Sequence, residues 1–207
     1  MYAVKKIREL AKSRSIGPSP SFTEFDLVKT LEIVDKQKTI GRTLLSKGLG
    51  LGQGATRTIL DHLERAELVE VGRLGCILTS RGSRLLKDLR SVVRVGFWIP
   101  QAILPIGPFN CGALVSKAGQ RIRKGLEQRD AAIRVGASGA TTFVYRDGKL
   151  LFPPDEVASK EWPELSDKII EVFQPGQNDV VIVTGASSSR LAEAGALAAA
   201  WTLLENV

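Results

Sequence analysis

The sequence has 207 residues, of which 43% are hydrophobic and 25% charged, a composition typical of folded globular proteins and not of disordered ones. Two cysteines are too few for a disulfide framework, and no apolar run reaches the length of a membrane span or forms a signal peptide. We therefore expect a cytoplasmic protein that contains one large domain or two small ones.

The excess of positive over negative charge is confined to the first half of the chain. Residues 1–94 hold 18 Lys and Arg against 10 Asp and Glu, a net charge of +8, whereas residues 95–207 hold 11 against 12, a net charge of −1. Such asymmetry indicates a module that binds a polyanion, joined to a domain of a different kind. We therefore predict two domains, one over residues 1–94 and one over residues 95–207.

The chain is predicted to begin with a short basic helix. Apolar residues recur at helical spacing over residues 2–10, with lysines and arginines between them. Such a helix either packs on its own domain or on a partner subunit, or contacts DNA phosphates, and we favour packing. It ends at the Gly- and Pro-rich stretch 16–21.

Two further helices are predicted before residue 50. Thr23 is a suitable N-cap for a helix over residues 23–35, which has a continuous apolar face. Thr39 is the corresponding cap for a helix over residues 39–49, in which Leu44 is expected to face inward with the neighbouring leucines.

Four alternating glycines follow in the stretch GLGLGQGATRTILDHLERA, residues 48–66. A dinucleotide-binding loop would need a strand before its glycines, and here a predicted helix precedes them. The Gly-Lys-Ser/Thr of a Walker loop is also absent. We therefore interpret the glycines as a tight turn between two helices, with Gly48 or Gly50 in the left-handed conformation, which is the geometry of a helix-turn-helix.

A hairpin and a closing helix complete this pattern. Strand-like residues 68–71 and 76–78 flank the turn 72–75, which has a basic tip, and Thr79 then caps a helix over residues 80–90. Three helices, a two-stranded hairpin and a closing helix are the elements of a winged helix.

Residues 23–90 thus resemble the winged helix-turn-helix domain of prokaryotic transcription regulators. The stretch ILDHLERAELVEV (59–71) resembles the end of a recognition helix that runs into the wing, and LTSRG (78–82) resembles the start of the helix after the wing. Glu67 is a departure, because such domains often carry glycine there. The whole chain also resembles an archaeal two-domain family whose C-terminal half has no established role.

The resemblance implies that the first domain binds double-stranded DNA, with the helix after the glycines in the major groove. Arg57 can then bond a guanine edge and Gln53 an adenine edge, while the surrounding basic residues suit phosphates. A winged helix used for protein contacts is the alternative, and the local basicity argues against it. His62 is expected at the surface or facing phosphate. The predicted DNA-binding residues are Arg42, Lys47, Gln53, Thr56, Arg57, Thr58 and Arg73.

The second half is predicted to be an α/β domain with a mixed sheet, so the fold class of the chain is α+β. Residues 95–110 are interpreted as a connector or as an irregular edge that packs on the domain. Strands are predicted over residues 110–116, 132–135, 141–145, 149–152 and 180–183, and helices over residues 119–129, 162–173 and 192–204. The last helix is rich in alanine and is expected to pack on the sheet or to form part of a dimer seam.

Two Gly-Ala-Ser loops, residues 136–138 and 185–187, are each predicted to follow a strand, and the second opens a helix. The N–H groups at a helix N-terminus favour an anion, although a serine there is often only an N-cap. The predicted ligand-binding residues are Gly136, Ser138, Gly139, Gly185, Ser187, Ser188 and Arg190.

Two function classes remain open at this point. The first is a homodimeric transcription regulator whose second domain dimerises or senses a small anionic effector. The second is a small enzyme domain that binds a nucleotide or phosphate ligand and is regulated or localised by the winged helix. We favour the first, because the sequence offers no catalytic triad, paired carboxylates or metal-ligand cluster. No catalytic residue, metal, cofactor or membrane contact is predicted.

Overall fold

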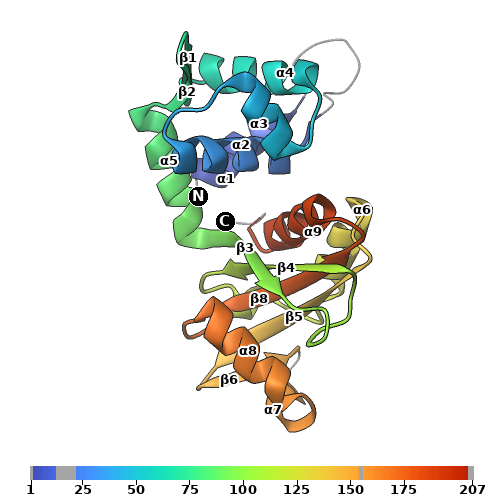
Figure 1. Cartoon of the computed structure of the whole chain (residues 1–207). Coiled ribbons are helices and arrows are strands. Elements are labelled where there is room, and N and C mark those ends of the chain that lie inside the picture. Colours follow the sequence, from blue (N-terminus) through green and yellow to red (C-terminus); the bar gives the residue numbers. More distant parts are fainter. Residues whose placement is uncertain (1, 13–21, 154–155, 205–207) are drawn as a thin grey trace. The chain divides into compact units, whose positions relative to one another are not determined.

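The computed structural model describes residues 2–12, 22–153 and 156–204, and the chain divides into two compact units, Met1–Arg90 and Ser91–Val207 (Figure 1). The Gly- and Pro-rich stretch 16–21 lies outside the described residues. In the described part of the chain, no helix is both long enough and apolar enough to cross a membrane.

The first two helices of unit 1 pack against each other. In α1 (Tyr2–Ala11), the side chains of Ala3, Val4, Ile7 and Leu10 are buried, and the helix contacts α2 (Glu24–Gln37). Thr23 precedes α2, and the carboxylate of Asp26 accepts hydrogen bonds from the Thr23 backbone N–H at 2.8 Å and from its hydroxyl at 2.9 Å. The N-terminal helix therefore packs on its own domain, as the favoured interpretation required.

The next two helices meet at the glycine turn. Gly50 ends α3 (Arg42–Leu49) with a left-handed φ of 65°, and α4 (Gln53–Arg65) follows in contact with α3. The predicted cap at Thr39 is wrong, because α3 begins after Gly41. Leu44 is consequently 63% exposed and does not face inward.

The hairpin of β1 (Val69–Gly72) and β2 (Gly75–Leu78) is attached to the segment before α3. Ile40 and Cys76 exchange backbone hydrogen bonds of 3.1 and 2.8 Å. Gly75 has a φ of 131°, and a Cβ there would lie 2.8 Å from the carbonyl oxygen of Ile40. This close approach fixes the hairpin relative to α3 and requires glycine.

Helix α5 (Ser80–Val92) closes unit 1 against the hairpin and α2. The Thr79 hydroxyl oxygen accepts the Gly82 N–H at 3.0 Å, as a cap should. Arg90 donates to Asp35 of α2 at 2.6 Å, and this hydrogen bond lowers the pKa of the Asp35 carboxyl, with Lys38 assisting. Glu67, at the position where winged helices often carry glycine, has a left-handed φ of 58°.

Unit 2 contains a six-stranded sheet that is antiparallel throughout, so the prediction of a mixed sheet is wrong. The last strand along the chain inserts between two earlier ones and runs opposite to both. In spatial order the strands are β3 (Val93–Ile99), β4 (Phe109–Val115), β8 (Val180–Ala186), β5 (Gly139–Arg146), β6 (Lys149–Phe152) and β7 (Glu156–Val157).

Helices cover both faces of this sheet (Figure 1). On one face, α6 (Leu126–Arg134) and α9 (Ser189–Trp201) pack together and on β4, β5 and β8. On the other face, α8 (Pro163–Phe173) follows the short α7 (Ala158–Glu161) and adds Phe173 to a core with Phe143, Val181 and Val183.

Helix α9 packs within unit 2. A Cβ on Gly195 would lie 2.9 Å from the Cβ of Ala137, and the Thr184 hydroxyl donates to the Ala192 carbonyl at 2.6 Å. Most alanines of α9 are buried, including Ala192 and Ala194. The small residues therefore serve close packing on the sheet and on α6, the first of the two predicted roles.

Of the two interpretations of residues 95–110, the structure agrees with the packed edge, because the segment contains most of the edge strand β3. Two other predicted elements of unit 2 need correction. The predicted strand at residues 132–135 is the end of α6, and the predicted helix at residues 119–129 is a 3₁₀ turn, η1 (Gly119–Arg121), followed by the start of α6. The predicted strands 141–145 and 149–152 are confirmed as β5 and β6, and Asp147 and Gly148, with positive φ of 49° and 77°, form the turn between them.

Candidate nucleic-acid interface

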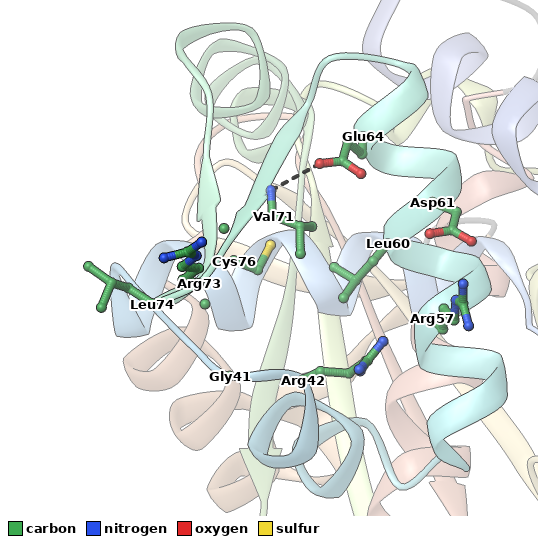
Figure 2. Close-up of a pocket in the computed structure, with 12 residues that line it drawn as sticks. Gly41, Arg42, Arg57, Leu60, Asp61, Glu64, Val71, Arg73, Leu74 and Cys76 are labelled. Carbon is green, nitrogen blue, oxygen red and sulfur yellow. Dashed lines mark hydrogen bonds between the residues drawn. The ribbon is translucent and has the colours of Figure 1, made fainter.

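Helices α3 and α4 and the β1–β2 hairpin surround an open hollow of about 610 Å³ in unit 1 (Figure 2). Each of these elements contributes an arginine to its lining. Arg42 comes from the first turn of α3, Arg57 from α4 and Arg73 from the hairpin turn. Positive side chains that are distant in sequence are therefore brought to one surface, which we call the arginine hollow.

The arginines of the hollow are exposed and unpaired. None of the three forms an ion pair with any described residue, although Asp61 and Glu64 line the same hollow. Elsewhere in unit 1, Arg81 pairs with Glu67, and Arg90 with Asp35. The positive charge of the hollow is thus available to an external anion.

The outward face of α4 carries four polar residues at helical spacing. Gln53, Arg57, Asp61 and Glu64 are all exposed and recur every three or four residues, so they lie along one side of the helix. The Glu64 carboxylate accepts the Val71 N–H at 3.1 Å (Figure 2), which ties the far end of this face to the hairpin.

Six of the predicted DNA-binding side chains are exposed in the structure, and Thr56 is not. Thr56 is completely buried and donates its hydroxyl to the Gly52 carbonyl at 3.1 Å. Its spacing from Ile59, Leu60 and Leu63 places it on the buried stripe of α4, so it is excluded from the interface. The exposed residues are Arg42, Lys47, Gln53, Arg57, Thr58 and Arg73.

Three glycines near the hollow have no packing reason to be glycine. A Cβ on Gly41, Gly52 or Gly54 would meet no atom within 4 Å, and none of the three has a positive φ. Gly41 and Gly52 are the N-caps of α3 and α4. The backbone at both helix N-termini is therefore accessible to a partner molecule.

His62 has a structural role, which corrects its assignment to the surface or phosphate side. Its side chain is half-buried, and Nδ1 lies 3.2 Å from the Leu10 carbonyl oxygen, which accepts a hydrogen bond when Nδ1 is protonated. The ring also meets Phe22 edge-on, with centroids 5.3 Å apart. These contacts join α1 to α4.

Cys76 is the buried residue of β2, and burial raises the pKa of its thiol to about 11, with the negative charge of Glu64 as a second cause. The thiol is therefore protonated and unreactive at neutral pH. We expect iodoacetamide at pH 7.5 to leave Cys76 unmodified in the native protein and to modify it after denaturation, as read by peptide mass spectrometry. Rapid labelling of the native protein would instead show that the hairpin opens readily.

In unit 2, the two Gly-Ala-Ser loops lie side by side. The Ser138 N–H donates to the Gly185 carbonyl at 2.7 Å, and Gly139 pairs with Gly185 across β5 and β8. The first loop follows helix α6 and not a strand, which corrects that part of the prediction. Among the described residues, no cluster of three or more His, Cys, Asp or Glu could hold a metal ion.

Two of the three predicted ligand-binding glycines, Gly139 and Gly185, are buried against neighbouring residues. A Cβ on Gly185 would lie 2.5 Å from the Gly107 nitrogen, and one on Gly139 would lie 3.4 Å from Ile106. Both glycines are buried, so neither can contact a ligand as predicted.

The remaining predicted ligand residues differ in accessibility. Gly136, Ser138 and Ser187 are exposed. Arg190 is half-buried and engaged with other residues. Ser188 is the N-cap of α9, and its Oγ accepts the Leu191 N–H at 3.3 Å, so the capping interpretation accounts for it.

Comparison with known proteins gives a family match and a structural match. The structure is similar to "Hypothetical protein PH0730 from Pyrococcus horikoshii OT3", with a TM-score of 0.68 and 25% identity over 89% of this chain and 94% of that one. No curated protein matches the chain. Residues 106–203, within unit 2, match the family model described as "Domain of unknown function (DUF4443)".

Proposed function

We propose that the protein is a DNA-binding transcription regulator and that unit 1 is a winged helix-turn-helix domain. The order of elements supports this proposal: α2, α3, a glycine turn, α4, a hairpin and α5. In such a domain α4 is the recognition helix, which enters the major groove, and the β1–β2 hairpin is the wing.

The observation that carries the proposal is the arginine hollow. A phosphate strand separates the major groove from the minor groove, so the strand passes between a recognition helix in one and a wing in the other. Arg42 of α3 and Arg73 of the hairpin turn line the hollow and are suited to phosphates, whereas Arg57 is exposed on the recognition helix α4 and is suited to base edges. Guanidinium groups bind phosphate oxygens in pairs, which lysine cannot do.

The open glycines add to this argument. The first N–H groups of a helix carry partial positive charge and bind phosphate oxygens. A side chain at Gly41, Gly52 or Gly54 would stand between those groups and the DNA backbone, although it would disturb nothing within the protein. Glycine at these positions is therefore explained by a partner that approaches the helix N-termini.

Unit 2 is proposed to dimerise or to sense an effector. Its edge strand β3 presents Trp98, which lies on the same face of the sheet as Phe109 of β4, and both aromatic side chains are 44% exposed. Apolar side chains on an open edge suit contact with a second copy of the chain. Ser138 and Ser187 are the exposed serines left for an anionic effector.

The test of DNA binding is its salt dependence. Fluorescence anisotropy of the full-length protein with duplex DNA should give log K falling linearly with log salt, with a slope of roughly −0.9 per phosphate contact. Arg73→Ala should weaken binding to all sequences about equally and reduce the slope by about 0.9. The stoichiometry at saturation reports whether two chains occupy one site.

Arg84→Ala is the matched control for this experiment. Arg84 is an exposed arginine on α5 that does not line the hollow, so its replacement removes the same charge from the same unit. We expect the slope to stay near that of the wild type. An equal loss of slope in the two variants would mean that the hollow is not the phosphate site.

A further inference from the structure

Asp61 is an unpartnered carboxylate at the centre of the proposed interface. It is exposed on α4, lines the arginine hollow and forms no hydrogen bond or ion pair with any described residue. Glu64, which lines the same hollow, differs because its carboxylate accepts the Val71 N–H. The hydrogen bond to the hairpin explains why a carboxylate is present at residue 64, but no contact with a described residue of unit 1 explains the carboxylate at residue 61.

Stabilisation of α4 does not explain Asp61 either. Asp61 lies one helical turn after Arg57, both residues line the hollow, and Figure 2 shows their side chains on the same face of α4. Positive before negative at this spacing is the less favourable order for a helix ion pair, and the two side chains form no ion pair here. A carboxylate facing DNA also repels phosphate, so its presence weakens non-specific binding.

We propose that Asp61 selects a cytosine in the recognised DNA sequence, an inference that rests on the proposed function of unit 1. An ionised carboxylate only accepts hydrogen bonds. In the major groove the cytosine N4 amino group is a donor, whereas guanine presents two acceptors and thymine an acceptor and a methyl group. Adenine pairs its N6 donor with an adjacent N7 acceptor, so cytosine suits a carboxylate best. Asp61 thus favours cytosine by accepting a hydrogen bond from its N4 amino group, and it disfavours guanine and thymine because their acceptors repel the carboxylate.

The spacing on α4 predicts where this cytosine lies. Asp61 lies four positions after Arg57 on the helix, a rise of about 6 Å. Successive base pairs are roughly 3.4 Å apart, so a helix that follows the groove places the two side chains about two steps apart at most. The cytosine is therefore one or two base pairs from the position that Arg57 reads.

Binding-site selection from random duplex DNA tests this inference on the full-length protein. Wild type should prefer cytosine at the stated distance from the position that changes in Arg57→Ala. Asp61→Ala should lose about tenfold discrimination there and bind other sequences more tightly. Asp61→Asn should shift the preference to adenine, because a carboxamide can donate to N7 and accept from N6.

Glu70→Gln is the matched control, since Glu70 is an exposed carboxylate of β1 that does not line the hollow. It should keep the wild-type preference. The inference is overturned if the Asp61 variants keep the cytosine preference, or if they change only the position that Arg57→Ala changes. A wild type that selects no DNA sequence overturns the proposed function as well, so the two failures are distinguishable.

Discussion

Replacing Arg57 with alanine is expected to weaken binding to the preferred DNA site by about 1–3 kcal/mol and to abolish discrimination at one base pair. Arg57 is exposed on the outward face of α4 and has no ion-pair partner among the described residues, so we expect the variant to lose proposed contacts with DNA and no ion pair within the protein. Titration of the selected site and of single-base variants, at one fixed salt concentration, measures both effects.

Arg73→Ala is the comparison that separates base recognition from phosphate contact. It removes the same charge from the hairpin turn and not from α4, and it should leave every base preference intact. If the Arg57 variant kept the wild-type preference and lost only affinity, Arg57 would be a phosphate contact. The recognition surface would then have to lie elsewhere on α4.

Gly82→Ala is expected to destabilise unit 1 by about 3 kcal/mol, a large effect for one methyl group. Gly82 lies in the first turn of α5, and a Cβ there would lie 1.9 Å from the carbonyl oxygen of Leu68. Because that oxygen belongs to the backbone entering β1, relief requires the hairpin and helix to separate. Thermal unfolding followed by far-UV circular dichroism measures the loss.

Gly54→Ala is the matched substitution, and it is expected to change the stability of unit 1 in the opposite direction. Gly54 also lies in the first turn of its helix, but a Cβ there meets nothing within 4 Å. Alanine should therefore stabilise unit 1 by about 0.5 kcal/mol through helix propensity and a restricted unfolded chain. Equal stability of the two variants would show that the hairpin moves away from the methyl group added at residue 82 without a loss of folding free energy.

Local patterns were sufficient to predict most of unit 1. Thr23 and Thr79 mark helix starts through side-chain capping, and Gly50 marks a helix end through its left-handed conformation. The prediction failed at Thr39 because Ile40 pairs with Cys76, a contact with a distant strand. Capping is a property of neighbouring residues, whereas this backbone pairing is not visible in them.

Unit 2 was harder to predict because its pattern is ambiguous at short range. Residues 132–135 are a short stretch with three apolar residues and Arg134, which fits the end of a helix as well as a strand, and the stretch is the end of α6. The antiparallel sheet depends on β8 lying between β4 and β5. No spacing within those strands indicates that order.

The candidate interface could have been predicted more completely from helical phase. Thr56 shares its face of α4 with Ile59 and Leu63, and that spacing indicates burial. Asp61 lies one turn after Arg57, so the same argument places it on the outward face. The convergence of arginines from α3, α4 and the hairpin depends on the Ile40–Cys76 pairing, and helical phase carries no information about it.

The central position of β8 determines when unit 2 can form during synthesis. The strand pairs with β4 on one side and β5 on the other, yet it follows both in the chain. Until residues 180–186 leave the ribosome, β4 and β5 each present an open edge, whereas the elements of unit 1 pair mostly with near neighbours. Unit 1 can therefore fold while unit 2 is still incomplete. A chain interrupted before residue 180 would carry a folded first unit and two unpaired strand edges, a combination prone to aggregation and proteolysis.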